Sequence, residues 1–237
     1  MYQDADNLVK KVLERSISLK NKQFAVIGLG RFGESLIGEL SRNGCEVLAI
    51  DTDRERVNDA ADIATHAVQA DAMDEQALKS LGIRNFDVVI VAIGHNIQAN
   101  ILATIILKEM GVKTVIAKAQ NELHGKVLEK IGADLVIYPE RDMAIKLARS
   151  LISENILEQV KLSTDYSIME LVAPKSFSGK TLLELKLGEK MGVTVLAIKH
   201  NENIIVAPGR EQKISRGDIL VTLGNNSDLE KIGKLES

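Results

Sequence analysis

Aromatic residues are scarce in this chain of 237 residues: they make up 3% of it, and tryptophan is absent. A folded core must therefore be built from aliphatic side chains. Aromatic platforms of the kind that stack the bases of single-stranded nucleic acid are not expected. Cysteine occurs once, as Cys45, so no disulfide framework can form within the chain. This is typical of a reducing cytoplasm.

Long apolar runs are also missing, since no stretch approaches the roughly 20 apolar residues that span a bilayer. Charged residues interrupt the N-terminal segment, which argues against a signal peptide. With 30 basic and 33 acidic residues, the net charge of −3 gives no general attraction to nucleic acid or anionic lipid. We therefore expect a cytoplasmic protein without a nucleic-acid partner, which can still dock onto a membrane protein.

Short apolar segments alternate with helical patterns from residue 24 to about residue 150. Glycines follow three of the expected helices, at Gly44, Gly111 and Gly132, and Asp74 and Asn96 stand where N-caps belong. This alternation predicts an α/β fold, a Rossmann-like doubly wound parallel sheet with helices on both faces. The strands are expected over residues 24–28, 46–50, 66–70, 87–92, 114–118 and 135–138, and the helices near 32–43, 53–61, 74–81, 97–110, 122–131 and 140–153.

The pattern changes after about residue 165. Strand patterns are now separated by polar, turn-rich segments, and the helical patterns are short. We expect a small α+β domain with strands over 166–172, 193–199, 204–206 and 219–223 and helices near 181–190 and 227–234. The expected organisation is an N-terminal extension with helical apolar spacing (residues 1–21), a Rossmann nucleotide-binding domain (22–150), a connecting segment (151–164) and a C-terminal domain (165–237).

The most specific motif lies at the start of the alternating region. An apolar strand runs into Gly28-x-Gly30-x-x-Gly33, a helix follows, and a second apolar strand ends on Asp51. The first glycine permits a tight turn, the second lets a pyrophosphate approach the backbone, and the third lets the helix pack on the strand. Strand, glycines, helix, strand and terminal acid together predict a site for an adenosine phosphate.

Side chains beside this motif indicate which phosphate compound fits. Asp51 can accept hydrogen bonds from both ribose hydroxyls and would repel a 2′-phosphate, or it can cap the helix that follows Thr52 and Asp53. Of these, Asp53 is the better candidate for the cap. Arg31, next to Phe32 inside the glycine loop, suits a ligand with more phosphate charge than NAD, unless it is a solvated surface residue.

Residues at the other strand ends border the same expected cleft, because parallel sheets bind ligands at the carboxyl ends of their strands. A lysine such as Lys118 can hold phosphate, and Glu140 can hold a divalent cation that bridges phosphates or can serve as a first-turn helix acid. His95 and His124 lack the spacing of metal ligands. The strand-end candidates are Ala70, Asp71, Ile93, Gly94, His95, Lys118, Ala119, Gln120, His124 and Glu140.

No second constellation for chemistry accompanies the glycine motif. A dehydrogenase needs an acid–base group and a substrate-binding cation, and the C-terminal part offers one histidine, His200. A P-loop lysine motif, which would indicate ATP hydrolysis, is also missing. The sequence therefore predicts a nucleotide sensor without an enzymatic activity.

Several segments resemble one family. Over residues 22–235 the chain is similar to the regulatory RCK (KTN plus TrkA-C) subunits of bacterial Ktr/Trk potassium uptake systems, and among them to the KtrA/KtrC type. The segments that carry this resemblance are 24–33 (FAVIGLGRFG), 50–51 (ID), 81–86 (LGIRNF), 89–94 (VIVAIG), 118–121 (KAQN), 126–134 (KVLEKIGAD) and 139–143 (PERDM).

The resemblance implies an octameric ring, assembled from dimers, on the cytoplasmic face of an integral-membrane potassium-translocating subunit of the KtrB, KtrD or TrkH type. It further implies that ATP favours the active ring and ADP the inactive one. By position, Asp51 would hold the ribose, Arg31 would contact the γ-phosphate, and Glu140 would bind Mg²⁺ or Ca²⁺ between paired nucleotides. Residues 93–95 and 118–120, together with His124, would line the pocket.

One segment departs from the family pattern. Some relatives bind cyclic di-AMP in the C-terminal domain with the help of an arginine, and Gly188 stands where that arginine would be. This argues against cyclic di-AMP as a ligand. The leading hypothesis is thus an ATP- and ADP-sensing gating subunit. The alternatives are an NAD(H)-dependent oxidoreductase and an NAD(H)-binding redox sensor.

Overall fold

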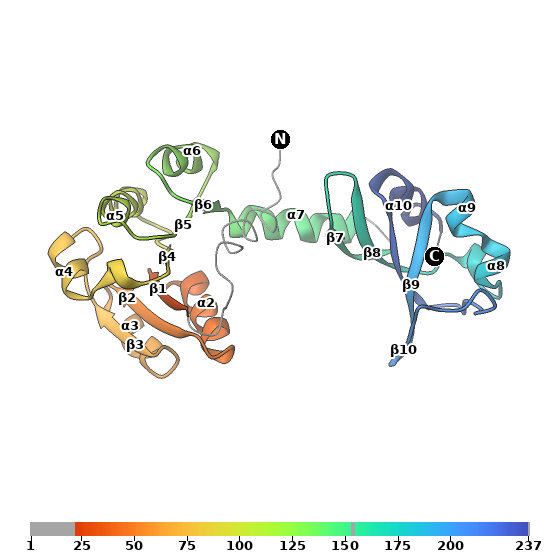
Figure 1. Ribbon diagram of the computed structural model, residues 1–237, viewed down its shortest axis with the longest axis horizontal. Helices are drawn as coiled ribbons and strands as arrows, with labels where there is room; N and C mark the ends of the chain where they lie inside the picture. Colours follow the sequence, from red (N-terminus) through yellow and green to blue (C-terminus); the bar gives the residue numbers. More distant parts are fainter. Residues whose placement is uncertain (1–21, 153–154, 237) are drawn as a thin grey trace. The chain divides into compact units, whose positions relative to one another are not determined.

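The computed structural model describes residues 22–152 and 155–236. These residues form two compact units, which divide between Pro139 and Glu140. Figure 1 labels their helices and strands and colours them along the sequence. The helix expected within the N-terminal extension lies outside the described residues. Within those residues, no helix is long and apolar enough to cross a membrane.

The first unit is built on a six-stranded parallel sheet with the strand order β3-β2-β1-β4-β5-β6. The chain order reverses between β1 and β4, which are neighbours in the sheet, and this is where doubly wound folds bind ligands. The predicted fold class is confirmed. The strands are β1 (Gln23–Ile27), β2 (Glu46–Asp51), β3 (His66–Gln69), β4 (Val88–Val91), β5 (Val115–Lys118) and β6 (Leu135–Ile137).

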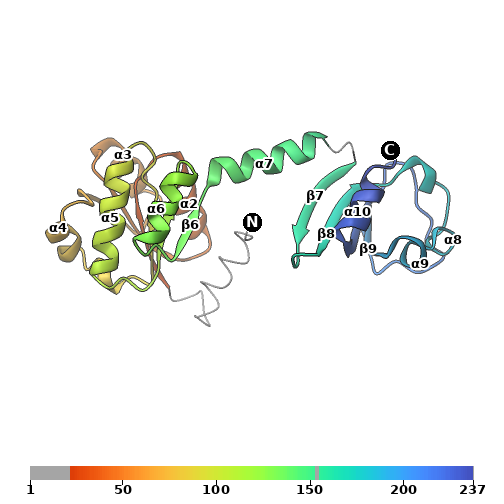
Figure 2. The same cartoon turned by 90° about the horizontal axis from the view of Figure 1, so that it is seen from above.

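Helices cover both faces of this sheet (Figure 2). One aliphatic core packs alternate strand residues against α2 (Arg31–Arg42) and α3 (Arg54–Ala61). The other packs the opposite strand residues against α4 (Glu75–Ser80), α5 (Ile97–Glu109) and α6 (Glu122–Lys130). Aliphatic side chains dominate both cores, as the composition predicted; Phe24 is buried in one, and Phe86 and Tyr138 pack against the other.

Local signals set the helix boundaries. The Asp74 side chain accepts hydrogen bonds from the first turn of α4, and the Asn96 side chain accepts one from the first turn of α5, so both predicted N-caps are confirmed. Gly44, Gly111 and Gly132 have φ values of 76°, 77° and 98°, which a residue with a Cβ adopts at a cost. These glycines therefore end their helices, and the chain continues into the next strand.

The second unit contains α7 (Pro139–Ile152), most of which belongs to it, and a five-stranded antiparallel sheet with the order β10-β9-β11-β8-β7. Its strands are β7 (Ile156–Lys161), β8 (Tyr166–Val172), β9 (Val193–His200), β10 (Asn203–Val206) and β11 (Ile219–Asn225). Residues 151–164 were expected to connect the two domains without a strand. In the structure β7 lies in this segment and pairs with β8. The α+β character of the unit is as predicted.

Short helices cover the antiparallel sheet. One hydrophobic core contains Phe177, Leu187, Leu229 and Ile232, which pack with strand residues such as Leu220. These residues come from a 3₁₀ turn (Lys175–Phe177), α9 (Leu187–Met191) and α10 (Asn226–Gly233), and α8 (Leu182–Leu185) precedes α9. The second unit thus has a hydrophobic core of its own.

Candidate nucleotide-binding site

The glycine turn between β1 and α2 has the geometry that its spacing predicted. Gly28 has a φ of 99°, and its amide donates to the Ile50 carbonyl oxygen at 2.8 Å. A Cβ at Gly28 would lie 2.8 Å from the Ile93 amide nitrogen, and one at Gly33 would lie 2.0 Å from the Gly28 carbonyl oxygen. Both glycines are therefore required by the packing of the chain itself.

Gly30 differs from its two neighbours in the motif. Its φ of −73° is open to any residue, and a Cβ there would meet no atom of residues 22–152 or 155–236 within 4 Å. It is also the N-cap residue of α2, and none of the described side chains caps that helix. The first amide groups of α2 are therefore available to an anion, and the helix dipole favours one at this place.

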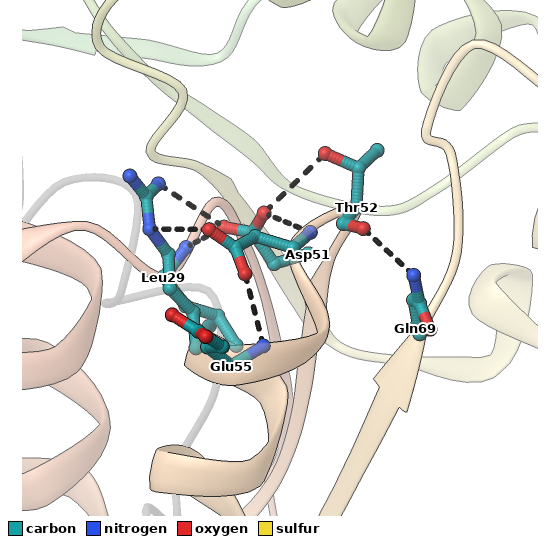
Figure 3. Close-up of polar contacts among 7 residues, drawn as sticks. Leu29, Asp51, Thr52, Glu55 and Gln69 are labelled. Atoms are coloured by element: carbon teal, nitrogen blue, oxygen red, sulfur yellow. Dashed lines mark hydrogen bonds and ion pairs between the residues drawn. The ribbon is translucent and has the colours of Figure 1, made fainter.

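Asp51 closes the other side of this turn (Figure 3). Its side chain is buried, with 8% of the residue exposed, and one oxygen accepts from the Leu29 amide at 2.6 Å while the other accepts from the Asp53 amide at 2.9 Å. A carboxylate oxygen has two lone pairs, so the oxygen that accepts from Leu29 retains one for a ligand hydroxyl. The oxygen that accepts from Asp53 also accepts a long hydrogen bond from the Thr52 hydroxyl at 3.5 Å, which a ligand hydroxyl can replace. Asp51 thus links the ends of β1 and β2 and leaves acceptors for a ribose.

The helix cap in this region belongs to Asp53. Its side chain accepts from the Glu55 amide at 2.9 Å, as the sequence analysis favoured. Arg56, one turn further along α3, lies 3.8 Å from an oxygen of Asp51 and 3.5 Å from an oxygen of Asp53. Arg56 was not among the site residues predicted from the sequence. Its position five residues after the strand-end acid, in the first turn of a helix, was the available signal.

Lys118 brings a positive charge to the ends of β4 and β5. Lys118 is buried, and its Nζ lies 5.7 Å from the centre of the Phe32 ring. The same Nζ would lie 3.6 Å from a Cβ at Gly94. Phe32, Gly94 and Lys118, which were selected from three different segments, therefore lie together. Arg31 precedes Phe32 in the first turn of α2 and is exposed.

The remaining strand-end candidates divide into buried and exposed positions. Ala119 is buried, Ala70 and Ile93 are half-buried, and Thr52, His95 and Gln120 are exposed. Asp71 is also exposed, and its carboxylate accepts from the Met73 amide at 2.9 Å, so that it closes a local turn. These positions follow the carboxyl ends of β2 to β5, the edge that carries the glycine turn.

His124 lies in the first turn of α6 with 4% of the residue exposed. Its Nδ1 accepts a hydrogen bond from the Gln120 amide at 3.3 Å. Burial lowers the pKa of His124 below its usual value because the charged ring would lose its hydration. The ring is therefore neutral at neutral pH, and its Nδ1 holds the Gln120 amide in place.

Glu140 lies in the first turn of α7 and is exposed. Across the part of the chain that the structure describes, no three His, Cys, Asp or Glu side chains gather closely enough to hold a metal ion. A cation bound by Glu140 would therefore need oxygen ligands from elsewhere. Nucleotide phosphates are suitable, since Mg²⁺ in nucleotide sites is commonly held by one or two carboxylates together with phosphates.

Comparison with known proteins identifies the family. Models of the TrkA-N domain and the TrkA-C domain match residues 24–139 and 167–236. The chain is 51% identical to the Ktr system potassium uptake protein C and 53% identical to the Ktr system potassium uptake protein A of Bacillus subtilis, in each case over 90% of this chain and 96% of the relative. The chain belongs to the Ktr family of RCK proteins. It is a regulatory subunit of a potassium uptake system and not an enzyme, as its sequence predicted.

More distant similarities agree with this assignment. The Ktr system potassium uptake protein A of Vibrio alginolyticus is 41% identical over 88% of this chain and 95% of its own length. Among solved structures, the GsuK channel matches 96% of this chain with a TM-score of 0.66 at 18% identity, and the chain spans 43% of that protein. At this identity the similarity shows the fold alone. It confirms an RCK architecture for the described residues.

Proposed function

We propose that this chain senses adenosine nucleotides and gates potassium transport, with the ATP-bound form activating. The observation that carries the proposal is the pairing of two features at one edge of the sheet. The buried Asp51 offers acceptors for a ribose, and the N-terminus of α2 offers donors for phosphate, since no side chain in the described part of the protein caps it. The partner would be an integral-membrane potassium-translocating subunit of the KtrB, KtrD or TrkH type.

The glycine motif supports a ligand at this place. Gly28 and Gly33 are explained by contacts within the chain, whereas Gly30 is explained neither by its φ nor by a close neighbour. Room for a phosphate beside the backbone accounts for a glycine there. The three glycines of the motif therefore divide into two that shape the turn and one that keeps it open.

Cationic groups near the turn favour ATP or ADP over a dinucleotide. Arg31 lies in the first turn of α2, and Lys118 lies against Phe32, the next residue of that turn. Guanidinium and ammonium groups both bind phosphate, and two of them suit a polyphosphate. One structural neighbour is described as a GsuK channel bound to NAD and another as GsuK bound to ADP. An NAD(H)-binding redox sensor is therefore the alternative that an experiment must exclude.

Differential binding would couple the site to transport. A ligand shifts an equilibrium between two ring geometries only by the difference between its affinities for them. ATP and ADP differ in one phosphoryl group. A protein group that contacts the γ-phosphate must therefore account for their different effects on the two ring geometries. Arg31 is the candidate for this contact, within its own subunit or from a neighbouring one.

Assembly into a ring on the cytoplasmic face of the membrane belongs to the same proposal. Met143, Leu147 and Leu151 stand four residues apart on α7 and are 64%, 57% and 76% exposed. Side chains at this spacing share one face of a helix. An apolar stripe of this kind supports contact between copies of the chain, and we propose dimers that assemble into an octamer.

A thermal-shift panel with ATP, ADP, NAD, NADH and cyclic di-AMP tests the proposed function. A ligand at 100 times its dissociation constant stabilises a protein by about 2.7 kcal/mol. ATP and ADP are expected to raise the melting temperature strongly, and cyclic di-AMP is not. Strong stabilisation by NADH, with none by ATP or ADP, would instead support the redox sensor.

Gly188 in α9 underlies the expectation for cyclic di-AMP. A Cβ at this position would meet no atom of the described residues within 4 Å, so their packing does not exclude an arginine there. We infer that this chain lacks the cation that assists cyclic di-AMP in relatives. Nucleotide sensing would then depend on the site at the glycine turn and not on the C-terminal antiparallel sheet.

Arg31→Ala is expected to narrow the difference between the ATP and ADP dissociation constants, since the alanine cannot contact the γ-phosphate. Loss of one charge-assisted hydrogen bond weakens ATP binding by about 10-fold and leaves ADP binding nearly unchanged. Isothermal titration calorimetry measures both constants. Arg42→Ala, at the other end of α2, removes an exposed arginine and serves as the control. If the ratio of the ATP and ADP dissociation constants were the same in Arg31→Ala as in the wild type, Arg31 would not be the group that distinguishes the two nucleotides.

Glu140→Gln is expected to reduce the effect of Mg²⁺ or Ca²⁺ on ATP binding, because the amide is a weaker cation ligand than the carboxylate. The measurement is the ATP dissociation constant with the divalent cation and with a chelator. Glu122→Gln, an exposed first-turn acid of α6, controls for the change in net charge. If the divalent cation affected ATP binding equally in the Glu140 variant and the wild type, Glu140 would serve only as an acid in the first turn of α7.

A further inference from the structure

Asn100 joins the ends of two central strands. It lies in α5, is 0% exposed, and its Nδ2 donates to the Ile93 carbonyl oxygen at 2.8 Å and to the Lys118 carbonyl oxygen at 3.1 Å. Ile93 follows β4, and Lys118 is the last residue of β5. One buried amide therefore fixes the separation of the two strands at the edge where the nucleotide site lies.

His124 holds the same stretch of backbone two residues later. Its Nδ1 accepts from the Gln120 amide at 3.3 Å, as described above. Residues 118–120 are thus held at both ends by side chains from α5 and α6, helices that pack against each other on one face of the sheet (Figure 2). Neither hydrogen bond is part of the regular ladder that pairs β5 with its neighbours.

Both side chains are buried at a cost. Among the residues that the structure describes, neither Oδ1 of Asn100 nor Nε2 of His124, both buried atoms, has a hydrogen-bond partner. A buried polar atom that lacks a partner costs about 1–3 kcal/mol, and an aliphatic side chain would avoid that cost. Packing alone therefore does not explain why an amide and an imidazole occupy these positions. Their common feature is the contact with the backbone of residues 118–120.

We infer that Asn100 and His124 are positioning residues that hold residues 118–120, and with them the Lys118 ammonium group, in the geometry that binds nucleotide phosphate. This inference rests on the proposed function, because it deepens the account of the same site. Neither side chain has to touch the ligand. Each acts through the backbone, and a displacement of the Lys118 backbone moves its Nζ away from Phe32 and Gly94.

The positioning effect can be separated from a structural one on α5. Asn100→Ala removes the clamp, and Thr104→Ala is the matched control. Thr104 is equally buried on the same helix, and its hydroxyl donates to the Asn100 carbonyl oxygen at 2.8 Å without reaching a strand end. Both variants are expected to lose thermal stability. Only Asn100→Ala is expected to weaken ATP binding by the folded protein, by about 10-fold, the effect of one or two buried hydrogen bonds.

A second pair of variants tests His124, and it stays informative if Asn100→Ala fails to fold. An asparagine oxygen can take the place of Nδ1 as the acceptor for the Gln120 amide, whereas leucine fills the space without an acceptor. His124→Asn is therefore expected to keep ATP affinity within about 2-fold of the wild type. His124→Leu is expected to weaken it about 10-fold. If the ring only fills space, the leucine variant will instead bind ATP at least as well as the asparagine variant.

Calorimetric titration of ATP into each purified full-length variant gives the decisive constants. Affinity losses confined to Asn100→Ala and His124→Leu support the inference. Wild-type affinity in both variants overturns it and leaves the proposed function standing. A wild-type protein that binds neither ATP nor ADP overturns the proposed function and this inference with it.

Discussion

Asp51→Ala is expected to weaken the binding of every adenosine nucleotide by about 100-fold, the effect of losing two hydrogen bonds to a charged acceptor. The substitution also removes the acceptor for the Leu29 and Asp53 amides, which join the ends of β1 and β2. ATP and ADP should lose affinity to a similar extent, because both carry the same ribose. Calorimetric dissociation constants for the two nucleotides measure the effect.

Asp53→Ala is the matched control for this prediction. It removes a carboxylate two residues away that caps α3. Loss of a cap costs about 1 kcal/mol of folding stability, and nucleotide affinity should remain close to that of the wild type. If both variants bound ATP equally well, the ribose could not be held by Asp51.

Gly33→Ala is expected to have the largest effect on stability. The added Cβ would lie 2.0 Å from the Gly28 carbonyl oxygen, a backbone atom of the glycine turn that cannot move without opening the turn. Forced overpacking of this kind costs about 3 kcal/mol. Urea unfolding, followed by the loss of helical circular dichroism, measures the change in the free energy of unfolding.

Gly38→Ala on the same helix should act in the opposite direction. A Cβ at Gly38 would make contacts no closer than 3.8 Å, which is ordinary van der Waals distance. Replacing a helical glycine with alanine then stabilises the helix by about 0.5–1 kcal/mol. A Gly33 variant as stable as the Gly38 variant would contradict the close approach of α2 to the turn.

The first unit was predictable because local signals agreed with one another. Apolar strand segments, helix caps such as Asp74 and Asn96, and glycines with positive φ such as Gly111 each specify the same alternation. The glycine motif predicted where in this fold the nucleotide site lies. Asp51 and Gly33 were assigned from spacing alone, and the structure gives each of them a close contact within the turn.

The strand β7 could not be predicted in the same way. It is an edge strand at the end of the antiparallel sheet, and its sequence, ILEQVK, lacks strict alternation of apolar and polar residues. Leu157 and Val160 are exposed, so the burial that normally marks a strand is weak. Pairing with β8 is a tertiary contact that propensity does not reveal.

The buried supports of the site were equally hidden from the sequence. Asn100 lies in an apolar helix, where an asparagine gives no local indication of a partner 18 residues away. His124 was selected as a pocket residue, but only the structure shows its contact with the Gln120 amide. Motifs identify the groups that a backbone presents to a ligand. They do not identify the side chains that hold this backbone in place.

The rate of potassium flux into liposomes that contain the membrane subunit tests the central claim most directly. The flux is measured with the full chain and ATP, with the full chain and ADP, and with the Asp51→Ala variant and each nucleotide. We expect faster flux with ATP than with ADP for the wild type, and no nucleotide dependence for the variant. Equal flux with ATP and ADP for the wild type would contradict the account.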